Sequence, residues 1–588
     1  MQCYSNNGKN VEKDRLFNPL NGVKLTGGLF KQTFDNNIRY LKRINVDAML
    51  YWFRRRAGKD APGEPYTGHF EDNIKGQTAG LFLMGAGNVL RWQEESELRC
   101  IVDEIVDEIR NCSESDGYLM AVPKEEFGTL EYPHYVRIWL TYGLTAAALA
   151  GNPDAFPMLR RWQDWFNTCD DLPVIKYLML AFQGVVASTY VYNTPIGTLK
   201  DIDVTIEYYE EDWRLAQFIN KERNAIHTRN QPGFEPHPHG TEIEAMEGYL
   251  DLYRATGNHY YLRAVENFYD MYKREWQYPG GGIAMCEFEK AYPKCYWLSG
   301  DKHYNELCCS SFWLLLNQRF HRLYPDVEGY VAEMEASIYN IGIANQNGDQ
   351  NINYFALLDK KKTNYDSLVH CCCGVGTKMY GSLPEYIYSI APDMLSVDMF
   401  AASEFIWERE SGIVCVEMET DMPYGYGVIL RINCKPQEFT LNVRIPRWVE
   451  GEVRIMLNGE YVASGLAGSY VSVCNNWKTE DHITFSLPFT WKTTRYEGAE
   501  QVEGFTRYAY EFGPLLMAFQ GPLDASGSII LDCSPEALTG LLETTDNQMY
   551  FVLQGHPGVT MRPYLEIKPD MPFTCYPLFK KSLLQVEE

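Results

Sequence analysis

The sequence predicts a toroid of helical hairpins followed by an antiparallel β-sandwich. Three observations lead to this prediction. From about residue 29 to 390, apolar residues recur at intervals of three and four, which is the period of amphipathic helices. After about residue 390, they alternate at period two in short runs between turn signals. At 588 residues, the chain is also too long for one ordinary hydrophobic core.

In the first half, short loop signals separate the helical segments, as expected for paired helices. Gly and Pro cluster in short polar stretches between the periodic segments, as loops between helices do. No strong motif returns at a fixed period, which favours a closed toroid over a regular solenoid. The clearest helical segments are 29–56, 79–112 and 242–276.

The second half reads as short antiparallel strands. Residues 427–434, 439–448 and 482–491 alternate apolar and polar side chains, and LNGE at 457–460 is a hairpin signal. From roughly residue 500, mixed strands and loops allow a second small β domain. The expected domains are therefore an N-terminal segment packing on the sandwich (1–28), a helical catalytic domain (29–390) and a β-sandwich region (391–588).

Composition excludes several classes of function. Hydrophobic residues make up 45% and charged residues 22% of the chain, the balance of a soluble globular protein. The net charge of −25, without a cluster of Lys and Arg, excludes a nucleic-acid partner. The sequence contains no run of 18 or more apolar residues, so we expect no transmembrane helix. The polar N-terminus favours the cytoplasm, with the periplasm after signal removal as the alternative. The oligomeric state stays open, with a homodimer among the options.

Two cysteine-containing segments carry the strongest chemical signal. Cys371, Cys372 and Cys373 are consecutive, and neighbouring cysteines rarely form structural disulfides. Glu306 lies two residues before Cys308, so a carboxylate and several thiols offer the four ligands that a tetrahedral Zn²⁺ accepts. Sulfur ligands favour zinc over calcium or magnesium. The alternatives are buried inert cysteines or a thiol redox sensor.

Several motifs occur together in one order along nearly the whole chain. They resemble the motifs of the β-L-arabinofuranosidases of glycoside hydrolase family 127 and of the related family 146. The segments that carry the resemblance are LNGVKLTGGLF (20–30), GEPYTGHFE (63–71), DGYL (116–119), LYRATGNHYYL (252–262), Glu306-x-Cys308, Cys372-Cys373, LNVRIPRW (441–448) and RYAYEFGPLL (507–516).

The resemblance implies an (α/α)6-type catalytic barrel and a retaining exo-glycoside hydrolase. Its substrate would be a terminal furanose of plant-type glycans, either a β-L-arabinofuranoside or a pectic sugar such as aceric acid. The resemblance also implies a Zn²⁺ cofactor held by Glu306, Cys308, Cys372 and Cys373, with Cys372 as the nucleophile. The family's C-C is followed by P-P-N, but here Gly374 follows, so the choice among the three cysteines stays open. Cys371 and Cys309 are then extra thiols beside the site.

The general acid/base departs from the family pattern. The family has a Glu sixteen residues before the zinc-ligand Glu, and Lys290 stands there in this chain. A shift of one residue makes Glu289 the acid/base, and Glu287 is a second candidate. If these residues form only a charged turn, the chain is an inactive carbohydrate-binding relative with a structural zinc.

The substrate-binding residues also differ from the family. His239 lies one position from a family substrate-binding His, and His237 is close to it. The histidines of two other family segments, G-H-x-x-G-H and H-E-L-Y, are missing, which predicts a changed pocket. The residues expected to take over as pocket contacts are Gln77, His134, Arg137 and Trp139.

Overall fold

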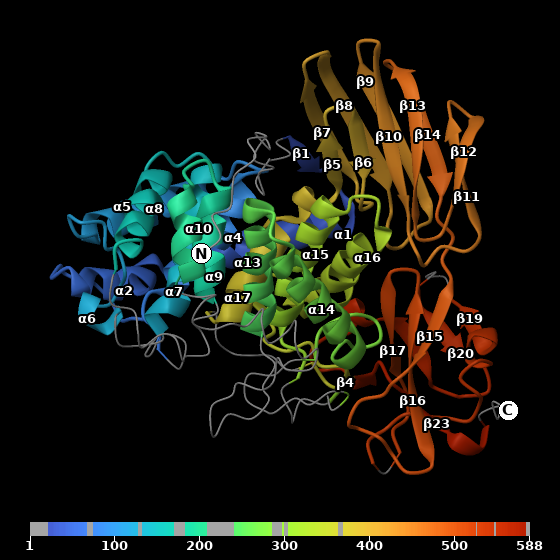
Figure 1. Ribbon diagram of the computed structural model, residues 1–588. Helices are drawn as coiled ribbons and strands as arrows, with labels where there is room; N and C mark the ends of the chain where they lie inside the picture. Colours follow the sequence, from blue (N-terminus) through green and yellow to red (C-terminus); the bar gives the residue numbers. More distant parts are fainter. Residues whose placement is uncertain are drawn as a thin grey trace.

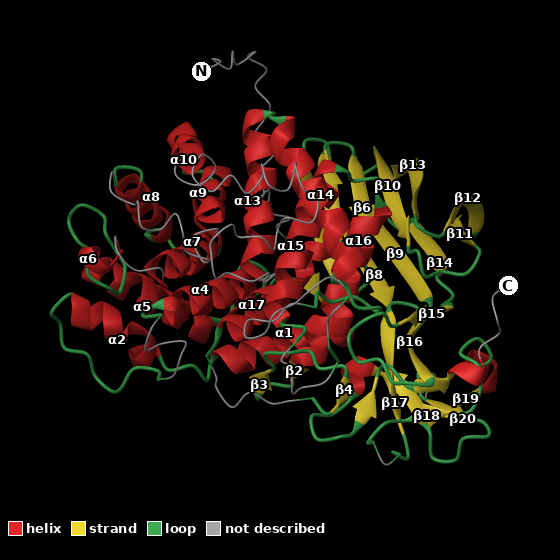
Figure 2. Cartoon of the chain, turned by 60° about the horizontal axis from the view of Figure 1, so that its bottom comes forward, coloured by secondary structure: helices red, strands yellow, loops and turns green. Residues whose placement is uncertain are grey.

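The computed structural model describes residues 22–67, 74–127, 132–169, 183–207, 240–284, 294, 297–298, 304–362, 369–524, 526–545 and 549–583. Figures 1 and 2 show a helical domain on one side of the molecule and β-sheets on the other. The predicted order, with helices first and antiparallel sheets after them, is confirmed. Within these residues, no helix combines the length and the apolar character that crossing a membrane requires.

The helical domain contains long helices joined by short loops. In chain order they are α1 (Gly28–Leu41), α2 (Val46–Arg56), α4 (Gln77–Leu90), α5 (Ser96–Cys112), α6 (Lys124–Phe127), α7 (Tyr132–Leu149), α8 (Ala155–Phe166), α9 (Gln183–Asn193), α10 (Leu199–Thr205), α13 (Gly240–Thr256), α14 (His259–Glu275), α15 (Leu307–Leu323), α16 (Glu328–Ala336), a π-helical turn (Ser337–Ile343) and α17 (Cys371–Gly381).

Six of the described helices form a closed ring. Around the ring, α4 packs against α7, α7 against α9, α9 against α13, α13 against α15, α15 against α17, and α17 against α4. An outer helix covers each member of the ring: α5, α8, α10, α14, α16 and α1, in the same order starting from α4. This double ring is the (α/α)6 barrel.

The sequence of each helix matches its layer. Every residue of α4 is buried, as expected for an inner helix that is surrounded on all sides. The outer helix α5 instead buries one stripe, which includes Leu98, Val102 and Ile105. Two glycines let inner helices touch: a Cβ on Gly80 would lie 2.5 Å from the carbonyl carbon of Trp139. A Cβ on Gly143 would lie 2.5 Å from the carbonyl oxygen of Gly80, so α4 and α7 pack backbone against backbone.

Two sheets, built from strands that follow the barrel together with β1 from before it, face each other. The first has the order β1-β7-β8-β9-β14-β11-β12, and the second has the order β13-β10-β6-β5. Trp407 of β7 packs edge-on against Phe439 of β10, which stacks on Trp477 of β13. The strands are β1 (Val23–Leu25), β5 (Tyr388–Ala391), β6 (Met394–Val397), β7 (Ser403–Arg409), β8 (Gly412–Thr420), β9 (Gly427–Cys434), β10 (Gln437–Ile445), β11 (Glu452–Leu457), β12 (Glu460–Leu466), β13 (Ser469–Trp477) and β14 (His482–Ser486).

The last part of the chain forms a separate sheet, drawn in orange and red in Figure 1. Its strand β22 pairs with β4, which belongs to the loop between α16 and α17, so this sheet is joined to the barrel. Its strands are β15 (Trp491–Arg495), β16 (Phe505–Phe512), β17 (Leu515–Gln520), β18 (Ile530–Leu531), β19 (Leu542–Thr544), β20 (Phe551–Leu553), β21 (Thr560–Pro563), β22 (Phe573–Thr574) and β23 (Leu578–Lys580), with β4 (Asp359–Lys360) from the barrel side.

A buried ion-pair network joins the sandwich to the barrel. The guanidinium of Arg444, on β10, donates to Glu328 at 2.8 Å and to Glu335 at 3.0 Å, both on α16. Arg444 is fully buried, and the indole of Trp448 also donates to Glu335 at 2.7 Å. The half-exposed Arg447 reaches Glu328 from the rim at 3.3 Å. The relative position of the two domains therefore depends on charges that have no access to water.

Replacing Arg444 with Met should destabilise the protein strongly. The change leaves two buried carboxylates without their cation, which costs about 3–5 kcal/mol. Urea unfolding followed by tryptophan fluorescence measures the loss. Arg447→Met is the control, because its half-exposed side chain should contribute much less. Equal losses in the two variants would contradict the assignment of the buried Arg444 as the main link.

Candidate active site

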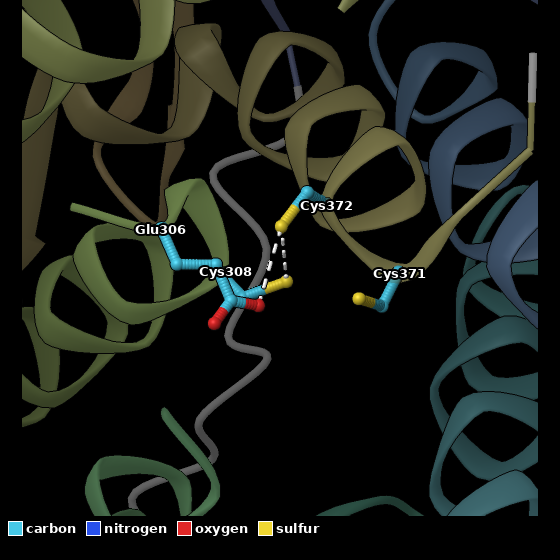
Figure 3. Close-up of side chains that lie close together, drawn as sticks. All are labelled: Glu306, Cys308, Cys371 and Cys372. Atoms are coloured by element: carbon cyan, nitrogen blue, oxygen red, sulfur yellow. Dashed lines mark hydrogen bonds between the residues drawn. The ribbon is translucent and has the colours of Figure 1, made fainter. Parts of the chain in front are cut away.

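Four side chains from two helix starts converge at one end of the inner ring (Figure 3). Glu306 is the N-cap residue of α15, and Cys308 lies in its first turn. Cys371 and Cys372 are the first two residues of α17. One ligand atom from each of these four residues lies within 4.8 Å of the other three, and all four residues are buried. We call this group the Glu/Cys cluster.

The shortest contacts within the Glu/Cys cluster involve Cys372. Its Sγ lies 3.0 Å from the Sγ of Cys308 and 3.4 Å from Oε1 of Glu306. Cys371 lies apart from this trio, across the cluster in Figure 3, and its Sγ is 3.4 Å from the hydroxyl of Tyr354. Sequence reasoning missed Tyr354, because nothing in its neighbourhood predicts contact with a cysteine seventeen residues further along the chain.

The extended segment of residues 354–356 fixes the position of Glu306. Glu306 forms an isolated β-bridge with Phe355, and the amide of Leu307 donates to the carbonyl of Tyr354 at 3.0 Å. The amide of Ala356 donates to the carbonyl of Asn305 at 2.9 Å. The same segment therefore positions both the carboxylate of Glu306 and the hydroxyl that faces Cys371.

The pKa values within the Glu/Cys cluster diverge. Burial raises the pKa of the Cys308 and Cys372 thiols well above the ordinary value. Hydrogen bonds from Cys308 and Cys372 hold the pKa of Cys371 well below it. Because several acidic groups share one dry site, only one sulfur carries charge easily unless a cation is present.

The donor set fits a soft divalent metal. Three sulfurs and one carboxylate oxygen match the ligand types and the number of ligands of tetrahedral zinc. A metal would also offset the cost of burying these acidic groups together. The four residues that could hold it are Glu306, Cys308, Cys371 and Cys372.

Cys373 is not part of the Glu/Cys cluster, although the sequence predicted it as a ligand. Its Sγ lies 2.8 Å from Nε2 of His370 and 3.7 Å from the carbonyl oxygen of Ile352. It also hydrogen-bonds with Tyr40, and burial raises its pKa to about 12. Cys371 takes the fourth position instead, because successive residues at the start of α17 point in different directions.

His370 holds the start of α17. Its Nδ1 accepts the backbone N–H of Cys373 at 3.1 Å, so His370 is the N-cap residue of the helix. Burial lowers the pKa of His370 to about 4, which keeps the ring neutral and able to accept this bond. Cys309, the other extra thiol, lies 3.9 Å from Oε2 of Glu306 and outside the cluster.

The predicted pocket contacts on α7 are engaged with the protein. His134 is buried, its Nε2 lies 2.8 Å from the carbonyl oxygen of Phe127, and burial lowers its pKa to about 3. Arg137 donates to Gln163 at 2.9 Å and to Ser188 at 2.6 Å. These contacts assign both side chains to the packing of inner and outer helices.

Two more of the predicted contacts lie on inner helices. Trp139 is buried and stacks on Phe312, one turn along α15 from Cys308, with ring centroids 6.2 Å apart. Gln77 begins α4 and is also buried. The remaining predicted residues lie outside the described part of the chain, namely Glu287, Glu289, His237 and His239.

The described residues next to the segments that contain Glu287, Glu289 and His239 lie near the first turn of α15, which carries Cys308. The amide of Ile283, which precedes the segment with Glu287 and Glu289, lies 3.4 Å from Oγ of Ser310 on α15. Gly240, which follows His239 in the chain, starts α13 beside Cys309: a Cβ there would lie 3.2 Å from the sulfur. Both segments thus join the described structure next to the first turn of α15.

Comparison with known proteins identifies the class of protein that this fold and site define. The family model described as β-L-arabinofuranosidase, GH127 catalytic domain, matches residues 22–385, and the GH127 middle domain matches residues 394–489. The chain therefore belongs to glycoside hydrolase family 127, as its motifs predicted, and it is a glycosidase.

Individual relatives are distant in sequence. A non-reducing end β-L-arabinofuranosidase from Bifidobacterium longum is 22% identical over 483 residues, which cover 70% of each chain. The crystal structure of a family 127 β-L-arabinofuranosidase from Geobacillus stearothermophilus superposes with a TM-score of 0.74 at 16% identity, covering 95% of this chain and 100% of that one. A second family 127 β-arabinofuranosidase gives 0.74 at 18% identity, covering 96% and 98%.

The arrangement of the three cysteines leads to a prediction about metal binding. Replacing Cys371 with Ser should weaken zinc binding more than about tenfold, because a direct sulfur ligand is lost. Cys373→Ser should keep the metal, since its Sγ faces His370. Competition with a chelator, followed by elemental analysis, measures both. Loss of zinc from Cys373→Ser but not from Cys371→Ser would instead support Cys373 as the ligand, as the sequence predicted.

Proposed function

We propose that the chain is a retaining exo-acting glycoside hydrolase with a cysteine thiolate as nucleophile. The substrate is a terminal furanose of plant-type glycans, namely a β-L-arabinofuranoside or a related pectic sugar such as aceric acid. The observation that carries the proposal is the Glu/Cys cluster at the start of α15 and α17, within the family 127 catalytic domain. The β-L-arabinofuranosidase activity named for the Bifidobacterium relative supports the choice of sugar.

Zinc is the cofactor in this proposal, held by Glu306, Cys308, Cys371 and Cys372. When bound, it keeps the sulfurs deprotonated at neutral pH. The protein residues fix the geometry: the segment around Tyr354 holds Glu306, and His370 caps the helix that carries both cysteines of α17.

Cys371 is favoured over Cys372 as the nucleophile. Cys372 is fully buried between Cys308 and Glu306, whereas Cys371 retains 5% exposure at the edge of the cluster. A nucleophile must meet the anomeric carbon from the substrate side, so the outer sulfur is the better placed of the two.

The reaction has two steps. In the first, the thiolate attacks the anomeric carbon, the bond to the leaving oxygen breaks, and a carboxylic acid protonates that oxygen. In the second, the same carboxylate removes a proton from water. The water oxygen attacks the anomeric carbon, and the carbon–sulfur bond breaks to restore the thiolate. Two displacements at one carbon retain its configuration.

Glu289 is the proposed acid/base, with Glu287 as the alternative. Support comes from the described residue Ile283, whose amide lies beside Ser310 on α15. Five residues lie between Ile283 and Glu289, a short span of chain that starts within one turn of Cys308. His239 is the proposed sugar contact, because Gly240 lies beside Cys309.

A test of the nucleophile uses p-nitrophenyl β-L-arabinofuranoside with the zinc-loaded protein. Wild type should hydrolyse it with retention, which NMR of the first-formed sugar detects. An acid quench during turnover followed by peptide fragmentation should place the sugar on Cys371. A sugar found on Cys372 would reverse the assignment. Full zinc loading without turnover would instead exclude simple arabinofuranoside hydrolysis and leave an acidic pectic sugar or a carbohydrate-binding role.

The acid/base is tested with two leaving groups. Glu289→Gln should lower kcat about 10²–10⁴-fold on an alkyl arabinofuranoside, because its leaving oxygen needs a proton. The loss should be much smaller with p-nitrophenolate, which leaves without one. Glu287→Gln is the matched control and should keep activity on both substrates. If Glu287→Gln lost activity on the alkyl substrate and Glu289→Gln kept it, Glu287 would be the acid/base. Both variants should bind as much zinc as wild type.

A further inference from the structure

A cavity lies apart from the Glu/Cys cluster. It has a volume of about 710 Å³, within the range of about 300–1,000 Å³ that small-molecule sites occupy. One wall is the hairpin of β2 (Gln346–Asn347) and β3 (Asn351–Ile352), which Figure 2 places on the barrel beside the C-terminal sheet. The opposite wall is residues 565–569 of the C-terminal region, and Arg43 from the α1–α2 turn closes the site.

Carboxamide groups dominate the barrel wall of this cavity. Such groups both donate and accept hydrogen bonds, which is what the hydroxyls of a sugar require. The hairpin holds them in place: Nδ2 of Asn347 donates to Asn351 at 2.8 Å and to Asn353 at 2.8 Å. The four carboxamide residues are Gln346, Asn347, Gln350 and Asn351.

Two cations complete the lining. Arg43 donates through Nη1 to the carbonyl oxygens of Asp349 at 2.6 Å and Gln350 at 2.5 Å, which anchors its guanidinium at the hairpin. Lys568 stands on the opposite wall. Among the described residues, neither is ion-paired with a carboxylate, although the chain has 78 acidic and 53 basic residues. Two cations in the lining of one cavity, without a carboxylate partner among the described residues, favour an anionic ligand.

Two carboxylates beside the cavity, Asp349 and Glu566, have partners other than Arg43 and Lys568. Asp349 pairs with Arg39 at 3.3 Å, and the hydroxyl of Tyr424 donates to Glu566. Because Glu566 also lines the cavity, a doubly charged group would be repelled there more strongly than a carboxylate, which carries one charge. A carboxylate, with one charge on each sugar residue, is therefore the anion that suits the site.

We propose that this cavity binds an acidic oligosaccharide, a glycan that carries uronic-acid carboxylates, separately from the catalytic site. The carboxylate lies between Arg43 and Lys568, and the sugar hydroxyls meet the carboxamide wall. That the ligand is a glycan rests on the proposed function; that it is an acidic one rests on the two cations.

The hairpin also connects this cavity to the catalytic site. Strand β3 ends at Ile352, whose carbonyl oxygen faces the Sγ of Cys373, and the chain then reaches Tyr354 beside Cys371. A polymer held at the hairpin is thus bound to the segment that borders the Glu/Cys cluster. The cavity retains an acidic backbone while its furanose side chains are cleaved.

The test measures binding of an oligogalacturonate to the zinc-loaded protein by calorimetry, with a neutral arabino-oligosaccharide in parallel. Wild type should bind the acidic chain with an affinity that falls as salt is added. Lys568→Glu should weaken that binding about tenfold or more, because an ionic contact becomes repulsive. Gln350→Ala should weaken it less. Lys435→Glu, an equal charge change in the exposed turn between β9 and β10, should have no effect.

Direct binding separates this proposal from the proposed function, since no turnover is needed. Lys568→Glu should hydrolyse p-nitrophenyl β-L-arabinofuranoside at the wild-type rate and melt at the wild-type temperature. No binding of the acidic chain to wild type would overturn the proposal, and so would equal affinity in Lys568→Glu. A wild type that binds but does not hydrolyse would refute only the proposed reaction.

Discussion

The close packing of the inner helices is the constraint on which the rest of this structure depends. The ring can close only if its helices are apolar on all sides and approach one another closely, as α4 and α7 do at Gly80 and Gly143. Closure brings the starts of α15 and α17 together, although 64 residues separate Cys308 from Cys372. The Glu/Cys cluster is therefore a consequence of the barrel rather than of any local loop.

Burying ionisable groups in such a barrel requires partners for each of them. Below the Glu/Cys cluster, Arg319 on α15 pairs with Glu247 and Asp251 on α13, and all three side chains are buried. Arg444 plays the same part between β10 and α16. The Glu/Cys cluster is different, because its own members are all acids. A bound cation would stabilise it, and metal binding would then be linked to the integrity of the site.

The β-rich regions support the barrel in two ways. The sandwich is fixed to α16 through Arg444 and Trp448, and the last sheet joins the barrel through the pairing of β22 with β4. The second contact region also forms the polar cavity beside the hairpin of β2 and β3. The same region of contact thus both joins the last sheet to the barrel and lines a polar cavity.

The sequence by itself determined the helical and β halves, the family and the two cysteine segments of the site. These features follow from apolar periodicity and from the order of residue types, and both are properties of the local sequence. The prediction that Arg137 and Trp139 contact substrate came from aligned positions alone. The structure places their side chains among other protein groups.

Only the tertiary structure decided which cysteines join Glu306. Three consecutive residues at the start of a helix point about 100° apart, so at most two of them can face one site. The direction in which α17 leaves its cap at His370, and the contact of Cys373 with Tyr40 on α1, select Cys371 and Cys372. That selection depends on how helices far apart in sequence pack together, which local sequence does not specify.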